Sequence, residues 1–254
     1  MSAKNRLLAR TLQIDSGREI LNGIVFYCMI IIISSCMPLL YLFFLLPYAA
    51  KAAGDYGTYL NLLASVLMIL ISFYLFSSVR LGFKRFFLKK AEYLDADFTD
   101  IVYYFKITEM IRTFVYCFKL FVYKSFFALI CIAPFILMSV LYVRMADKNL
   151  SLIISAIMLV SSFLFILNGL FFFIKINNSL FLTDFYFISG EYVSFSHILA
   201  SSQCVMKNKA SELSKLKISF IGWFTLCVFI IPIGYVFGYY GQAMAVLASK
   251  YIKE

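Results

Sequence analysis

The sequence predicts an all-α protein, a polytopic bundle of transmembrane helices, and three observations predict it. Five stretches without a charged residue hold most of the apolar side chains: 20–50, 56–79, 125–143, 149–174 and 218–249. The chain is 63% hydrophobic and only 14% charged, which lies outside the usage of soluble domains. Basic residues gather in alternate connecting segments. We therefore expect a single integral membrane domain over residues 1–254.

The length of each stretch supports this class. A helix that rises ~1.5 Å per residue needs ~20 apolar residues to cross the ~30 Å hydrocarbon core of a bilayer. Small residues follow the first stretch, as they follow a secretory signal. Its apolar part from Ile24 onward is about 23 residues long, however, which exceeds the ~7 to 15 residues of a signal peptide. We expect it to be retained as the first membrane helix.

The distribution of positive charge predicts the topology. Lysines and arginines number four before the first stretch and then one, nine, two and five in the successive connecting segments. Cytoplasmic loops accumulate basic residues, so the amino terminus is predicted to lie inside. The net charge of +10 then faces the anionic lipid headgroups of the bilayer, and we expect no nucleic-acid partner.

The last stretch contains Pro232 and Gly234 near its middle. A proline followed closely by a glycine is a turn signal as much as a kink. We predict a tight hairpin, with helices over roughly 216–231 and 235–252, which gives six membrane helices and a carboxyl terminus inside. A single tilted helix, with five crossings and an external carboxyl terminus, is the alternative.

Two cytoplasmic loops carry apolar residues at helical spacing beside lysines. We predict that each forms an amphipathic helix on the membrane surface. The residues of the predicted apolar faces are Phe98, Ile101, Val102 and Phe105 in the first loop, and Phe195, Ile198, Leu199, Ser202, Val205 and Met206 in the second.

Residues able to carry chemistry are few. The first loop holds five carboxylates: Glu92, Asp95, Asp97, Asp100 and Glu109. Paired carboxylates can serve acid/base catalysis or bind a metal ion, but a solvated face balanced by lysines is the commoner use. His197 has no second ligand at a suitable spacing, and the six cysteines form no C-x-x-C pair. We therefore predict no enzyme, no cofactor and no metal ion.

Two features of the predicted membrane segments are candidates for a functional or packing role. Asn168 is the clearest deep polar residue, and it lies either on a substrate pathway or in a hydrogen bond between helices. The last stretch places Gly234, Gly238, Gly241 and Ala245 on one helical face, where another helix can approach closely. That helix belongs to this chain by default, with a second copy or another membrane protein as alternatives.

The segment from Ser201 to Lys217 continues into Ser219, Phe220, Ile221, Gly222 and Trp223. It resembles the bacterial integral-membrane family known as domain of unknown function 975, whose final apolar region opens with the same five-residue motif. Asn208 directly follows Lys207, so the family's intervening glycine is missing. The likeness covers about a quarter of the chain. It implies a multi-pass protein of the bacterial cytoplasmic membrane and implies no activity.

Three functions fit these patterns. We expect a non-catalytic accessory, scaffolding or immunity-type membrane component that binds lipids or membrane proteins, as a partner of another chain or as a homo-oligomer. The alternative is a transporter or channel for an apolar or amphipathic solute, with Asn168 on its path. A lipid-modifying enzyme is third, and it would need the carboxylates between Glu92 and Asp100 at a pocket near the headgroups.

Overall fold

The computed structural model describes residues 17–40, 54–146, 152–190, 194–226 and 233–253, and every regular element in these ranges is helical. The elements are α2 (Gly17–Leu40), α4 (Gly54–Ala91), α5 (Phe98–Ile101), the 3-10 helix η2 (Tyr103–Phe105), α6 (Ile107–Ala146), α7 (Leu152–Ser179), α8 (Thr183–Ser189), α9 (Phe195–Ser219), α10 (Ile221–Leu226) and α11 (Ile233–Lys253). The all-α prediction is confirmed for the described part of the chain.

Within those ranges, three helical segments are long and apolar enough to cross a membrane: Leu63–Ala91, Ile107–Val143 and Ala156–Ser189. They correspond to the second, third and fourth charge-free stretches. Parts of the first and last stretches lie outside the described residues. The membrane class is thus supported by length and composition, and the number of six crossings stays a prediction.

The chain forms two compact units. Unit 1 contains Met1–Cys117 and Lys215–Glu254, and unit 2 contains Phe118–Ser214. Helices α6 and α9 each contribute one part to unit 1 and the other part to unit 2. The single membrane domain over residues 1–254 stays a prediction.

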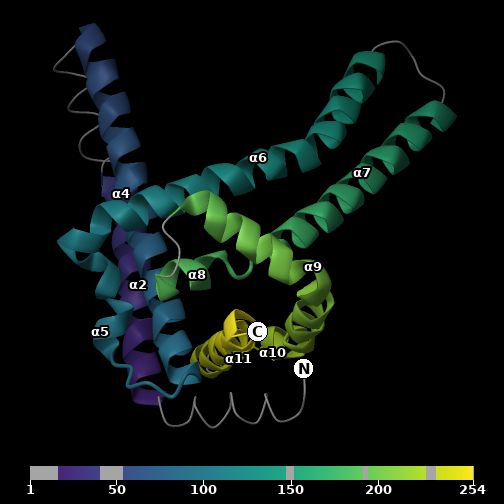
Figure 1. Ribbon diagram of the computed structural model, residues 1–254. Coiled ribbons are helices and arrows are strands. Elements are labelled where there is room, and N and C mark those ends of the chain that lie inside the picture. Colours follow the sequence, from purple (N-terminus) through teal and green to yellow (C-terminus); the bar gives the residue numbers. More distant parts are fainter. Residues whose placement is uncertain (1–16, 41–53, 147–151, 191–193, 227–232, 254) are drawn as a thin grey trace. The chain divides into compact units, whose positions relative to one another are not determined.

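Unit 1 is built around α4, with α2 and α11 packed against it (Figure 1). Glycines allow these close approaches, because a side chain at Gly82 would meet the Ile101 backbone and one at Gly241 would meet the Phe87 ring. Small residues play the same part wherever membrane helices pack tightly. Large side chains such as Phe86 and Leu81 are fully buried in this core.

The first of the two loops with a predicted amphipathic helix differs from its prediction. Two short pieces, α5 and η2, replace the single amphipathic helix expected over 98–105. Ile101 is 0% exposed. Its backbone lies against Gly82 of α4, and its side chain lies against Gly23 of α2. The expected apolar face therefore turns into the protein here, because glycines on α4 and α2 leave the space that Ile101 fills.

The second loop forms the predicted helix, α9. Ile198, Ser202 and Met206 of the predicted face are buried, and Lys207 is exposed. The Ser202 hydroxyl donates to the Ser179 carbonyl oxygen at 2.8 Å. Part of this face is therefore used in contact with the carboxyl end of α7 within unit 2.

A reversal of the chain separates α10 from α11. The Phe220 ring is tilted against the Tyr239 ring and edge-on to the Tyr240 ring, with centroids 5.0 and 5.2 Å apart, and the Trp223 ring lies 6.3 Å from the Tyr235 ring. These contacts fit the predicted hairpin, while its turn at 227–232 lies outside the described residues. The first arm starts at Ile221 and not near residue 216, because α9 continues to Ser219.

Candidate functional site

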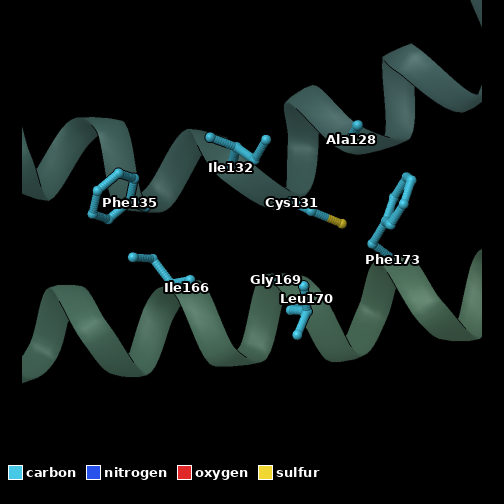
Figure 2. Close-up of a pocket in the computed structure, with 8 residues that line it drawn as sticks. All are labelled: Ala128, Cys131, Ile132, Phe135, Ile166, Gly169, Leu170 and Phe173. Atoms are coloured by element: carbon cyan, nitrogen blue, oxygen red, sulfur yellow. The ribbon is translucent and has the colours of Figure 1, made fainter. Parts of the chain in front are cut away.

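The clearest cavity in the described part of the chain is a groove in unit 2, between the antiparallel arms α6 and α7 (Figure 2). Its volume is about 390 Å³. Its lining is apolar throughout and comprises Ala128, Cys131, Ile132 and Phe135 of α6 with Ile166, Gly169, Leu170 and Phe173 of α7. Such a surface suits hydrocarbon and offers nothing for acid/base chemistry.

Gly169 sets the distance between the two arms. A Cβ atom at this position would lie 2.5 Å from the Cys131 carbonyl oxygen, so the two backbones touch there. Larger side chains on both sides of this contact separate the helices, namely Phe135 and Ile166 at one end and Phe173, opposite Ala128, at the other (Figure 2). The groove results from one close contact between helices that otherwise carry bulky residues.

Asn168 lies beside this contact but does not line the groove. It is exposed, and it makes no hydrogen bond to the described residues of the chain. The predicted hydrogen bond between helices is therefore not formed within this part of the protein. An exposed amide in an apolar helix needs a partner, since burying an unpaired polar group in hydrocarbon costs several kcal/mol.

Side-chain hydrogen bonds hold α9 against the middle of α6 and the carboxyl end of α7 within unit 2. Asn178 Nδ2 donates to the Ser214 hydroxyl at 3.0 Å, and Gln203 Nε2 donates to the Tyr123 hydroxyl at 3.1 Å. Polar contacts of this kind are found where helices leave the hydrocarbon. The end of the groove near Ala128 and Phe173 is therefore the end next to the polar region.

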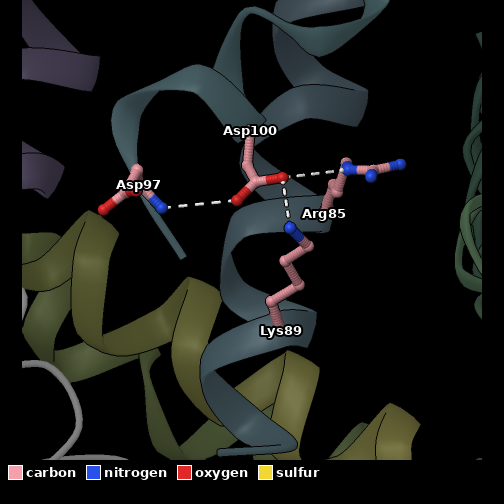
Figure 3. Close-up of polar contacts among 4 residues, drawn as sticks. All are labelled: Arg85, Lys89, Asp97 and Asp100. Atoms are coloured by element: carbon pink, nitrogen blue, oxygen red, sulfur yellow. Dashed lines mark hydrogen bonds and ion pairs between the residues drawn. The ribbon is translucent and has the colours of Figure 1, made fainter. Parts of the chain in front are cut away.

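Unit 1 contains a separate ionic cluster at the carboxyl end of α4 (Figure 3). Asp100 accepts from Arg85 Nε at 3.1 Å and from Lys89 Nζ at 2.8 Å, both on Oδ1, and its Oδ2 accepts from the Asp97 backbone N–H at 3.3 Å. The Asp100 side chain is 8% exposed. Burial raises the pKa of Asp100, but the hydrogen bonds from Lys89, Arg85 and Asp97 outweigh burial and hold it below its ordinary value.

Aromatic rings complete the cluster. The Arg85 guanidinium lies 3.7 Å from the centroid of the Tyr103 ring, and Tyr74 donates to the Tyr104 carbonyl oxygen at 2.8 Å. Burial raises the pKa of Tyr104 to about 12, so its hydroxyl stays protonated. With Asp100 neutralised by two cations and Tyr104 protonated, this cluster fixes the first loop on α4 and holds no poised acid or base.

The other loop carboxylates do not gather. Glu92 pairs with Lys253 at 3.6 Å, Glu109 pairs with Arg112 at 3.6 Å, and Asp95 is exposed. No group of three or more metal-ligating side chains occurs among the described residues, and His197 is exposed. The arrangement matches the simpler interpretation of these carboxylates, in which nearby cations balance them.

The glycine stripe of α11 contacts α4 of the same chain. Gly241 lies against Phe87, Ala245 is fully buried, and Gln242 Nε2 donates to the Phe87 carbonyl oxygen at 3.3 Å. Gly238 is also buried, whereas the surroundings of Gly234 lie outside the described residues. The helix that packs on this stripe therefore belongs to the same chain, which is the default expectation stated above.

The motif from Ser219 to Trp223 joins α9 to α10. The Ser219 hydroxyl donates to the Leu216 carbonyl oxygen at 2.7 Å, Phe220 is buried, and Ile221 and Trp223 are exposed. Gly222 is not closely packed, because no atom of a neighbouring element lies within 4 Å of the place where its Cβ would be. The motif is a joint between helices, with Phe220 as its anchor.

Comparison with known proteins adds no relative: no family model, no curated protein and no solved structure matches this chain. The resemblance to the bacterial membrane family therefore stays a prediction based on the residues between Ser201 and Trp223. The sequence had singled out Asn168 and the α11 stripe, but it had not singled out the groove. Gly169, next to Asn168, was the available signal, since a glycine amid phenylalanines in a membrane helix marks a close contact.

Proposed function

We propose that this protein is a non-catalytic component of the bacterial cytoplasmic membrane, of the accessory, scaffolding or immunity type, which binds membrane partners through the hairpin of α6 and α7. One observation supports this role above others. None of the most apolar part of Ile107–Val143 and only 6% of that of Ala156–Ser189 is buried within the chain, compared with 39% for Leu63–Ala91. This hairpin offers its surface to whatever surrounds it.

Asn168 distinguishes that surface from one that meets lipid alone. Acyl chains cannot hydrogen-bond to an exposed amide, whereas a helix of a neighbouring protein can, and such contacts contribute about 0.6 to 2 kcal/mol. The amide is also self-complementary, because it carries both donors and an acceptor. A membrane-protein partner, or a second copy of this chain, satisfies Asn168 where lipid does not.

The predicted topology fits this role. Six crossings with both termini inside place the basic loops and α9 at the cytoplasmic headgroups, where anionic lipids attract lysine and arginine. The joint at Phe220 and the ionic cluster at Asp100 then serve as structural supports on that side of the membrane.

The groove favours a second function, a transporter or channel for an apolar or amphipathic solute. Its apolar lining, about 390 Å³ in volume, suits such a molecule. A transport role requires in addition that the groove open in turn to each side of the membrane, and the close contact between Gly169 and Cys131 opposes such movement of the two arms.

The decisive experiment is gentle extraction of the full chain through a carboxyl-terminal tag, followed by mass measurement of the intact complex. We expect a stoichiometric second protein or a second copy. Asn168→Leu should lower its recovery about tenfold, which corresponds to the loss of one hydrogen bond in hydrocarbon. Asn208→Leu is the matched control, because Asn208 is an exposed asparagine on α9 outside the apolar stretches.

Two results would overturn the accessory role. The first is a purified single chain that by itself moves a solute across vesicles, and this would establish the transport alternative. The second is a monomer in the intact-mass measurement whose state is the same for wild type, Asn168→Leu and Asn208→Leu.

A further inference from the structure

The groove continues beyond its apolar lining toward the polar end of the hairpin. On α6, Lys124 precedes Ala128 by four residues, and on α7, Asn177 follows Phe173 by four residues. Residues four apart share a helix face. Ala128 and Phe173 lie at the same end of the groove (Figure 2). A cation from one arm and an amide from the other therefore stand at this end, one turn beyond the lining.

The length of this continuous face matches one leaflet of a bilayer. From Lys124 to Phe135 it covers twelve residues, and the eleven steps between them correspond to about 16 Å along α6. Half of the hydrocarbon core is about 15 Å thick. The charge-free stretch of α6 begins at residue 125, so Lys124 lies at the headgroup level while Phe135 lies near the midplane.

The dimensions of the groove favour a narrow occupant. The two arms approach so closely at Gly169 and Cys131 that the groove between them is narrow, with a volume of about 390 Å³. A helix is ~10 Å or more in diameter, whereas a single hydrocarbon chain is much thinner and fits such a groove better.

We infer that the groove holds one acyl chain of an anionic phospholipid, with the phosphate at Lys124 and Asn177. Charge supports the anionic class: among the described residues of unit 2 five lysines stand against two carboxylates, namely Lys119, Lys124, Lys175, Lys207 and Lys209 against Asp184 and Glu212. An ammonium and an amide N–H both donate to phosphate oxygens. The inference rests on the proposed role of the hairpin as a binding surface, and it names one ligand of that surface.

The test uses the full chain reconstituted into vesicles of equal parts phosphatidylglycerol and phosphatidylcholine. The protein is then extracted gently, and the mass of the intact protein–lipid complex is measured. We expect one retained phospholipid per chain, with phosphatidylglycerol preferred. Lys124→Gln should lower that preference about fivefold, the share of one lysine near an anionic surface. Lys175→Gln is the matched control, because Lys175 lies on the opposite face of α7 from Ile166 and Phe173, and its effect should stay below about twofold.

A second pair of variants tests the groove itself and does not depend on charge. Ala128→Phe places a ring inside the groove and should lower lipid retention at least about tenfold. Leu129→Phe, one residue away and 64% exposed, should leave retention unchanged. Both proteins should elute as single species with the wild-type helix content.

Equal losses for the two lysine variants would overturn the inference, as would retention that Ala128→Phe does not change. A dimer without lipid that Ala128→Phe dissociates would assign the groove to a second copy and would also overturn it. The partner-protein measurement is a separate readout. A variant that loses its lipid and keeps its partner leaves the proposed function standing, and a chain that keeps its lipid without any partner contradicts that function alone.

Discussion

Helices α4 and α7 are both long and apolar, yet the chain uses them in opposite ways. Helix α4 contacts α2, α5 and α11, carries glycine at its close approaches, and has polar side chains buried at Ser77 and Ser78. Helix α7 is the more apolar of the two and is almost entirely exposed. Apolar content therefore does not predict packing in this protein.

The physical reason is the solvent. In water the most apolar helix would be the most buried, but lipid tails are as apolar as leucine and provide no hydrophobic driving force between helices. Helices in a bilayer associate where small residues let backbones approach and where polar groups find partners. Unit 1 has both features along α4 and α11, whereas in the described residues of the unit 2 hairpin a glycine makes a close contact only at Gly169. Three substitutions test this contrast, in order of decreasing expected effect.

The strongest test is Gly82→Ala in unit 1. The new methyl group would overlap the Ile101 backbone, and backbone cannot move aside as a flexible side chain does. We expect a loss of about 3 kcal/mol in the free energy of unfolding, measured by chemical unfolding in detergent micelles. Gly222→Ala is the control, since open space surrounds that residue, and it should change stability by less than about 0.5 kcal/mol. Equal effects would show that packing at α4 is not tight.

Asp100→Asn comes second. It leaves Arg85 and Lys89 close together without their shared carboxylate, and we expect a loss of about 2 kcal/mol, below the 3–5 kcal/mol of a fully buried pair because both cations are partly exposed. Asp95→Asn, at an exposed position, is the matched control and should be neutral. A neutral Asp100→Asn would mean that the cluster does not stabilise the first loop.

The same cluster gives a pH dependence with a definite sign. The pKa of Asp100 is lowered in the folded protein, so the folded state binds this proton less tightly than the unfolded state does. The stabilisation is complete above the unfolded value of ~3.9 and is lost as the pH falls below it through the folded pKa. Melting curves recorded between neutral and acidic pH should show this loss in the wild type and a smaller loss in Asp100→Asn.

The smallest effect is expected at Phe171→Leu on the exposed face of α7, where the side chain is 67% exposed. The substitution keeps an apolar group against lipid, so stability should change by less than about 0.5 kcal/mol. The free energy of unfolding is measured on the isolated chain and again on the complex extracted from native membranes. A loss above about 1 kcal/mol in the isolated chain would show that this face is packed, and the contrast between the units would then fail.

How far the sequence predicted the site depends on the residue. The spacing of Gly238, Gly241 and Ala245 predicts a face for close packing, and Gly241 lies against Phe87 while Ala245 is buried. The face of α9 through Ile198, Ser202 and Met206 was also predictable from its period. The ion pairs of Asp100 with Arg85 and Lys89 were not predictable from the sequence, because contacts between segments, and not spacing, decide the partners of a carboxylate.

The sequence alone determined that this chain is helical and suited to a membrane, since the length of charge-free stretches reflects the thickness of a bilayer. It also marked where helices can approach, through glycine. Only the tertiary structure decided which apolar faces meet each other. Ile101 turns into the protein at Gly82, and α6 and α7 leave a groove around Gly169, because these outcomes depend on which side chains stand opposite one another in space.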